Sequence, residues 1–418
     1  MNTHFSYKGH FYLPDNPKKR ISGIITFNQE SGTELEIFGN FNPDNQKYEI
    51  ILGQVEIKGF ITLYSCINIS KRFSTIFINK YRSIFLFTGA NFYSKNELKF
   101  KHARIIALHF DEWINKSESF SIKESSDFKN IIVKYKTPMT INYDINSDFK
   151  IFFNFFPSDL EHSVVQKEIK IRQISYINFK YKRRKFFNDI VDDIYHFVDL
   201  LTLLTYTNSQ TNEITFNLPL KEFPHSIDVG LFIQSTKRKA NHNKLQPDDF
   251  IFPNYIIENK FDGILKKWYH DKVKRSTSSL PLFNEIYQLN LTTVDKFLSL
   301  SKSLEAYHRD YLESKDVYFV DRVSCLFERS RKIINPLLKI RSKPKFSQKI
   351  KKYRNDYTHS NPRISDTRVF IELHYLKQAM KLIMLSQYYI DLGIEEGLIN
   401  ERFVSSHKFD HLKSKIKC

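Results

Sequence analysis

Residues 346–359 read FSQKIKKYRNDYTH, and the next three residues are SNP. The apolar residues of this segment recur at steps of three and four positions, the spacing of one helix face: Phe346, Ile350, Tyr353 and Tyr357. Pro362 cannot continue a helix, because it lacks a backbone N–H and clashes with the preceding turn. The segment therefore predicts a helix that ends near His359.

The rest of the C-terminal third has the same periodicity. Three more segments repeat apolar residues at helical spacing: Val294–Leu312, Val317–Ile334 and Asp366–Ile390. Amphipathic helices joined by short connections predict a four- or five-helix bundle, which we place at residues 291–395. The polar segment 396–418 is expected to be a peripheral tail.

The N-terminal part of the chain has a different pattern. Short runs rich in Ile, Phe, Tyr, Val and Thr alternate with Asn, Asp, Ser and Gly, which is typical of antiparallel sheets. The predicted strands are Ile21–Phe27, Glu34–Phe38, Tyr48–Ile57, Thr75–Phe87, Ile105–Phe110, Ile131–Tyr135 and Phe149–Phe156. We expect residues 1–182 to form a β-rich domain of the sandwich or barrel type.

A mixed connecting region is predicted at residues 183–290. It begins with a long amphipathic helix over 184–206, followed by strands at Ile214–Leu218 and Val229–Gln234. The fold class is therefore α+β with several domains: an antiparallel, sandwich-like β domain and a helical bundle.

Basic residues are concentrated near the helix that ends at His359. The 418 residues include 64 Lys+Arg and 46 Asp+Glu, for a net charge of +18. Residues 329–354 contain eleven basic residues and no acidic one. Such a run predicts a surface that binds a polyanion. The candidate polyanion-binding residues are Lys343, Lys345, Lys349, Lys351 and Lys352.

The cysteines and the N-terminal segment indicate in which cellular compartment the protein is expected. The three cysteines, Cys66, Cys325 and Cys418, are far apart and form no CxxC pair, so we expect neither a disulfide framework nor a zinc site. The segment MNTHFSYKGHF contains no apolar core of a signal peptide, and no apolar run approaches the length of a membrane span. We therefore expect a cytoplasmic protein without a membrane partner.

Arg354 and His359 are the residues with a chemical interpretation. An Arg can hold two phosphate oxygens at once, and a His can move a proton near neutral pH. Five residues apart on a helix, the two side chains are offset by about 140°. Asn355 and His359, four residues apart, share a face. This pattern suits phosphodiester chemistry beside a basic surface.

Here the sequence resembles a known family. RNDYTH at 354–359 is similar to the Arg-polar-x3-His motif of HEPN ribonucleases, and FLSLSKSLEAYHRDY at 297–311 resembles the first HEPN helix of the ApeA-type, Abi-like anti-phage defence proteins. The segment FSYKGHFYLPDNPKKRISGIITFNQESGTELEIFGNF at 5–41 is similar to their β-rich N-terminal domain.

The resemblance implies an abortive-infection endoribonuclease in which Arg354, Asn355 and His359 are catalytic. It implies RNA cleavage without a metal or other cofactor, by attack of a ribose 2′-OH on the adjacent phosphate. A tRNA or another structured RNA is the implied substrate. The implied partners are a second copy bound through the HEPN domain, with a larger oligomer left open, and a phage-encoded protein as trigger of a regulatory N-terminal domain.

Several alternatives stay open at this point. A degenerate HEPN bundle would bind RNA without cleaving it, and an adaptor would use the bundle only to dimerise. Glu305 either pairs with the motif arginine or is exposed, and Asp356 either orients a neighbour or faces solvent. On the predicted helix 184–206, acidic residues and a histidine recur at metal-ligand spacing: Asp189, Asp192, Asp193, His196 and Asp199. We interpret them as the polar side of that helix.

Overall fold

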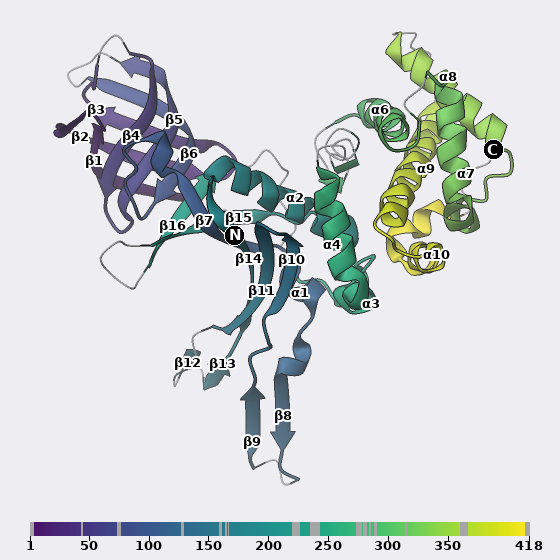
Figure 1. The fold of residues 1–418 in the computed structure, drawn as a ribbon, viewed down its shortest axis with the longest axis horizontal. Coiled ribbons are helices and arrows are strands. Elements are labelled where there is room, and N and C mark those ends of the chain that lie inside the picture. The colour runs from purple at the N-terminus through teal and green to yellow at the C-terminus, as the bar shows by residue number, and fades with distance from the viewer. Residues whose placement is uncertain are drawn as a thin grey trace. The chain divides into compact units, whose positions relative to one another are not determined.

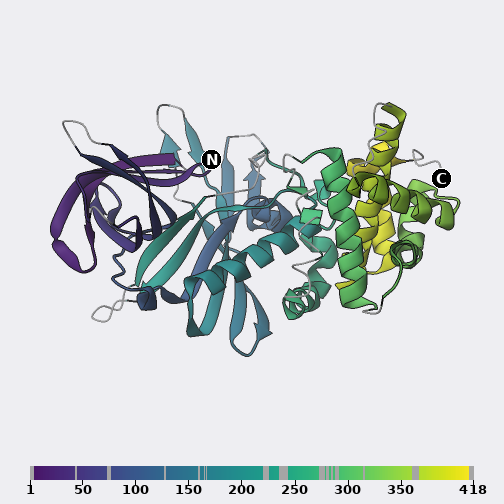
Figure 2. The same ribbon diagram turned by 90° about the horizontal axis from the view of Figure 1, so that it is seen from above.

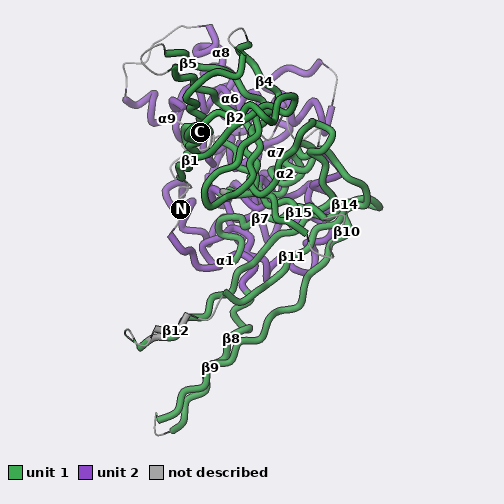
Figure 3. Tube along the Cα trace, turned by 90° about the vertical axis from the view of Figure 1, so that its left-hand side faces the viewer, with its two compact units in different colours: residues 1–111, 116–198, 209–237 green, residues 112–115, 199–208, 238–418 purple. Residues whose placement is uncertain are grey.

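The computed structural model divides the chain into two units (Figure 3). Unit 1 comprises residues 1–111, 116–198 and 209–237, and unit 2 comprises residues 112–115, 199–208 and 238–418. The structure describes residues 4–42, 45–72, 77–126, 129–158, 161–163, 165, 167–219, 226–234, 243–272, 278, 282–283, 286–287, 291–313, 316–359 and 367–413.

Six strands of unit 1 close into a barrel (Figure 1). They are β1 (His4–Leu13), β2 (Asn16–Asn28), β3 (Gly32–Phe38), β4 (Lys47–Val55), β5 (Gly59–Arg72) and β6 (Ile78–Thr88). The antiparallel order is β6-β3-β2-β1-β4-β5, and β5 pairs again with β6. Because side chains alternate between the two faces of a strand, residues such as Phe27, Leu35 and Leu63 fill the interior.

The sheet continues beyond β6. Its further strands are β16 (Ser226–Ile233), β15 (Thr211–Pro219), β7 (Lys99–Ala107), β14 (Gln173–Phe186), β11 (Phe149–Pro157) and β10 (Ile141–Asn146). Helix α2 (Phe187–Thr205) packs on it through aromatic contacts: Phe187 lies 5.0 Å from Phe87 and Phe197 lies 6.1 Å from Phe179, ring centre to ring centre. Two small hairpins complete unit 1: β8 (Phe120–Glu124) with β9 (Ile131–Tyr135), and β12 (Glu161–Ser163) with β13 (Glu168–Lys170).

The α+β fold class is confirmed, and the β-rich domain contains a closed barrel. The predicted strands are present as β2, β3, β4, β6, β7, β9 and β11, and the predicted long helix is α2. The prediction Ile105–Phe110 is wrong at its end, because His109 takes a φ of 64° and Phe110 begins helix α1 (Phe110–Ile114). Thr75, the predicted start of β6, lies outside the described residues.

Unit 2 is helical (Figures 1 and 2). Its helices include α3 (Asn254–Ile257), α4 (Phe261–His270), α6 (Thr293–Tyr311), α7 (Phe319–Leu338), α8 (Lys343–Thr358) and α9 (Thr367–Asp391). Helix α9 is buried almost all round from Leu373 to Tyr389, and both α6 and α7 pack against it. The four predicted bundle helices are thus confirmed. None of the described helices has the length and apolarity required to cross a bilayer.

The expectation of a peripheral tail is wrong for residues 396–412. Helix α10 (Glu396–Ser405) and the 3-10 helix η5 (His407–Leu412) follow α9, and α10 packs on α7. Phe403 and Phe409 are buried with their ring centres 5.2 Å apart. The segment is polar in composition, but four of its large apolar residues are buried: Ile399, Phe403, Phe409 and Leu412.

Candidate active site

Helix α8 carries the RNDYTH motif at its C-terminal end, with His359 directly after the helix. Ser342 caps its first turn by accepting a hydrogen bond from the Lys345 N–H, and Phe346 and Ile350 are fully buried. The helix ends at Thr358, whose hydroxyl donates to the carbonyl of Arg354 at 2.7 Å. Burial of one face therefore fixes which motif residues reach the surface.

Arg354 is held by residues from two other helices. Its Nη2 donates to Oε2 of Glu305 on α6 at 3.0 Å, and its Cζ lies 4.4 Å from the centre of the Phe319 ring on α7. The Arg354 side chain is 32% exposed and that of Glu305 36% exposed. Such a pair adds about 1 kcal/mol or less to stability. The main effect of the pair is to orient the guanidinium. Of the two alternatives for Glu305, the structure shows the one in which it pairs with the motif arginine.

His359 lies just beyond the end of α8. Its backbone N–H donates to the Asn355 carbonyl at 3.1 Å, and both residues are exposed. No hydrogen bond joins the His359 and Arg354 side chains within the described part of the chain. Pro362, predicted to end the helix, lies outside the described residues. The motif thus presents Arg354, Asn355 and His359 at one helix end, and their catalytic role stays a prediction.

A second polar cluster lies beside the motif, and the sequence analysis missed it. Glu372 on α9 accepts hydrogen bonds from the Tyr353 hydroxyl and from Nζ of Lys349. Burial and the Glu372 carboxylate raise the pKa of Tyr353. Although burial raises the pKa of Glu372, the hydrogen bonds from Lys349 and Tyr353 lower it overall. The one sequence signal was that α9 contains only two acidic residues, Glu372 and Asp391.

Two tyrosines of α8 stack at the motif. The rings of Tyr353 and Tyr357 are 6.2 Å apart with an interplanar angle of 14°. Burial and the nearby Asp356 charge raise the pKa of Tyr357. The two rings thus pack on each other across the turn that carries Arg354 and Asp356.

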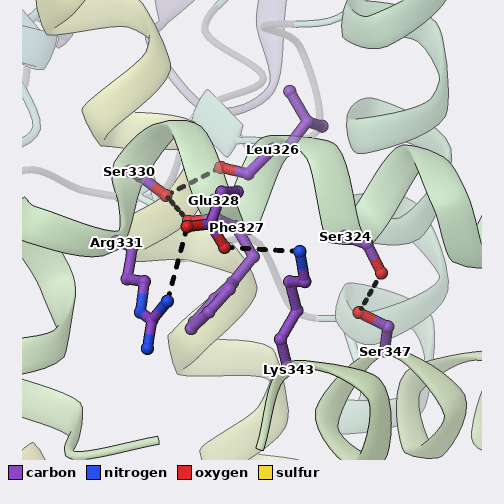
Figure 4. A network of polar contacts seen from close by, with 8 residues as sticks. All are labelled: Ser324, Leu326, Phe327, Glu328, Ser330, Arg331, Lys343 and Ser347. Atoms are coloured by element: carbon purple, nitrogen blue, oxygen red, sulfur yellow. Dashed lines mark hydrogen bonds and ion pairs between the residues drawn. The ribbon is translucent and has the colours of Figure 1, made fainter.

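The five candidate RNA-binding lysines fall into two groups. Lys343 lies 3.4 Å from Glu328, which Arg331 also contacts at 3.4 Å (Figure 4), and Lys349 pairs with Glu372. The others are exposed and make no ion pair with any residue that the structure describes: Lys345, Lys351 and Lys352. Carboxylates from other segments therefore neutralise part of the acid-free run.

The first residue of that run, Arg329, is also neutralised. Its Nη2 lies 2.9 Å from Oδ1 of Asp391, and its Nη1 lies 3.3 Å from the Tyr307 hydroxyl. Burial and the Asp391 charge raise the pKa of Tyr307. Arg329 therefore joins α6, α7 and α9 within the bundle.

The acidic residues of α2 have structural contacts. Asp193 accepts a hydrogen bond from the Tyr181 hydroxyl at 2.9 Å, and Asp199 accepts one from Tyr287. In the described residues, no three His, Cys, Asp or Glu side chains gather closely enough to hold a metal ion. The exposure of Asp189 and Asp192 beside the buried Ile190, Ile194 and Phe197 fits the polar side of an amphipathic helix.

Comparison with known proteins identifies both parts of the chain. Residues 6–268, well over half of the sequence, match the family described as ApeA N-terminal domain 1. Residues 285–398, which include the RNDYTH motif, match the family described as Apea-like HEPN. No curated protein and no solved structure matches the chain. The chain therefore belongs to the ApeA-like family of defence-associated HEPN proteins.

Proposed function

We propose that this protein is an anti-phage HEPN endoribonuclease that cleaves RNA, with a tRNA or another structured RNA as its substrate. The observation that carries the proposal is the placement of Arg354. Its guanidinium is half-exposed and oriented by Glu305 and Phe319, at the helix end where His359 is exposed. Three unpaired lysines lie on the same helix, where they attract an RNA backbone.

The proposed reaction needs one base, one acid and one cation. A His359 imidazole takes the proton of a ribose 2′-OH, and the oxygen attacks the adjacent phosphorus. Arg354 stabilises the charge that develops on the phosphorane oxygens. The bond from phosphorus to the 5′ oxygen breaks, and that oxygen leaves with a proton from an imidazolium. The products are a 2′,3′-cyclic phosphate and a 5′-OH.

The contacts of Arg354 support this role. A guanidinium has five N–H donors, and Glu305 accepts from one terminal nitrogen. Phe319 covers a face of the group, whereas phosphate oxygens bind at its edge, in the plane of the N–H bonds. The two contacts therefore orient Arg354 and leave donors for a phosphate.

The proposal includes regulation and assembly. Two copies pair through unit 2 and bring two motifs together. Unit 1 lowers the basal activity of the nuclease, without abolishing it, until a phage-encoded protein triggers it. Light scattering of the purified full-length protein tests the pairing, with twice the 49.9 kDa chain mass as the expected result. The mass of a single chain would contradict it.

Purified full-length protein tests the cleavage. Wild type is expected to cleave a labelled tRNA pool with EDTA present, and Arg354→Ala and His359→Ala are each expected to lose about 100-fold or more in rate. Full activity of His359→Ala would contradict the proposal. RNA binding with no cleavage by wild type would favour a non-catalytic RNA-binding protein instead.

A further inference from the structure

Tyr318 is an exposed aromatic residue directly before α7. It is 83% exposed, and its side chain makes no hydrogen bond or ring contact with any described residue. Single exposed apolar residues are common on protein surfaces, so exposure alone carries no functional meaning. The exposure of Tyr318 becomes relevant to function because of where the residue lies relative to Arg354.

The residue that follows Tyr318 contacts the motif arginine. Phe319 is buried, with 8% of its surface exposed, and its ring centre lies 4.4 Å from Cζ of Arg354. Consecutive Cα atoms are about 3.8 Å apart, so the Tyr318 side chain leaves the backbone one residue from this contact. The Tyr318 backbone is therefore adjacent to the residue that contacts Arg354, the group that would hold the scissile phosphate.

The backbone that carries Tyr318 is fixed by a buried arginine. Arg322 is 5% exposed, and its Nε donates to the Val317 carbonyl at 3.1 Å. The Tyr318 carbonyl accepts from the backbone N–H of Asp321 at 2.9 Å and of Arg322 at 3.1 Å. The ring thus projects from a tied backbone rather than from a free loop.

Arg322 is itself held from α6. Its Nη1 lies 3.2 Å from Nδ1 of His308, which is 3% exposed. Burial and the Arg322 charge lower the pKa of His308, and an arginine only donates, so Nδ1 of a neutral ring accepts this hydrogen bond. These hydrogen bonds link His308 on α6, through Arg322, to Val317, the residue before Tyr318. A ring on a fixed backbone loses little conformational entropy when another ring stacks on it.

We propose that Tyr318 binds an unpaired nucleobase by stacking, next to the phosphate held by Arg354. The inference rests on the proposed ribonuclease function and specifies its substrate: RNA whose bases are unpaired at the cleavage site. In a duplex each base is already stacked on its neighbours, whereas an unpaired base can be splayed onto an aromatic ring. Stacking also needs no particular base, so it positions the strand without reading its sequence.

The test uses full-length variants and a labelled RNA oligonucleotide, single-stranded or annealed to its complement. Tyr318→Ala is expected to weaken single-strand binding about 5- to 150-fold in a His359→Ala background, and to lower the cleavage efficiency of the otherwise native enzyme by a similar factor. Tyr318→Phe keeps the ring and is expected to match wild type. Tyr255→Ala, which removes another exposed tyrosine of unit 2, is the control and is expected to change neither quantity.

Each other outcome overturns the inference in a distinct way. If wild type cleaves RNA and Tyr318→Ala cleaves and binds it equally well, stacking at Tyr318 is wrong while the ribonuclease stands. If Tyr318→Ala loses activity and light scattering shows that it no longer forms the dimer of wild type, the ring is covered by a second copy rather than by a base. If wild type cleaves neither RNA, the proposed function itself is wrong.

Discussion

Arg354 owes its orientation to two side chains that are distant in sequence, Glu305 and Phe319. The periodicity of α6 and α8 predicted both helices, and the motif identified Arg354. The sequence offered pairing as one of two readings of Glu305 and gave no indication of Phe319. Contacts between helices depend on their packing angle and offset, which a periodic pattern in one helix does not specify.

At the residue scale, Glu305 is expected to act by positioning Arg354. Glu305→Gln removes the charge that orients the guanidinium, so we expect the turnover rate to fall about 10- to 100-fold. The apparent affinity for RNA is expected to stay equal or rise, because the variant no longer places a negative charge near the RNA backbone. Single-turnover kinetics and RNA titration separate the two effects. Glu401→Gln, an exposed position on α10, is the matched control, and equal rates for the two variants would contradict this role.

At the element scale, α8 combines a buried face, the motif and a row of lysines. The apolar spacing predicted the helix, which begins at Lys343 rather than Phe346 because Ser342 caps it and Pro344 is tolerated in the first turn. The run of basic residues predicted a surface that binds a polyanion. The structure divides it, because Glu328 and Glu372 from neighbouring helices neutralise Lys343 and Lys349. Such pairings over long sequence separation are not visible in a charge count.

The division of the α8 lysines into paired and unpaired ones predicts that the two sets contribute differently to the salt dependence of RNA binding. Replacing the unpaired lysines Lys345, Lys351 and Lys352 with Gln is expected to reduce the slope of log affinity against log salt by about 0.7 for each phosphate that the protein no longer neutralises, as for single-stranded nucleic acid. Replacing Lys343 and Lys349 is expected to change the slope less, because carboxylates already hold them. Fluorescence anisotropy at several salt concentrations measures both. Equal slopes for the two sets, counted per lysine, would show that the ion pairs open on binding.

Helix α10 is expected to contribute to the stability of unit 2. Phe403 is fully buried, and its ring centre lies 6.0 Å from that of Tyr389 on α9. Phe403→Ala leaves a cavity, so we expect the free energy of unfolding to fall by about 3 to 5 kcal/mol. The neighbouring Val404 is 38% exposed, and Val404→Ala is expected to change it by about 0.5 kcal/mol or less. Denaturant unfolding of both variants measures these changes. Similar changes in the free energy of unfolding for the two variants would indicate that residues 396–412 are a peripheral tail.

At the scale of the whole molecule, strand patterns predicted a β-rich domain followed by helices, and the structure agrees. The closure of the barrel was not predictable, because β5 pairs with both β4 and β6 and no local pattern specifies the second pairing. Residues 396–412 were misjudged for a related reason. Their polar composition suggested a solvated segment, whereas Phe403, Phe409 and Leu412 are buried. Composition averages over a segment and does not show which side a few apolar residues face.

The partly buried Lys408 predicts a pH dependence of the free energy of unfolding. Its Nζ donates to the carbonyls of Thr205 and Tyr206 at 3.0 and 3.2 Å, and burial lowers its pKa from 10.5 to about 8. Between these values the unfolded chain keeps a proton that the folded protein releases, so the free energy of unfolding rises with pH. Lys408→Met is expected to remove this rise. Thermal melts from pH 7.5 to 10 measure it, and equal slopes for Lys408→Met and wild type would contradict the assignment.

The proposed function depends on RNA cleavage at the RNDYTH motif. The most direct measurement is sequencing of RNA 3′ ends from cells after induction of wild type and of His359→Ala, with enzymatic removal of 2′,3′-cyclic phosphates as a parallel arm. We expect new cyclic-phosphate ends at defined RNA positions with wild type and their loss with His359→Ala. The same new ends in both strains, or no new ends with wild type under phage infection, would contradict it.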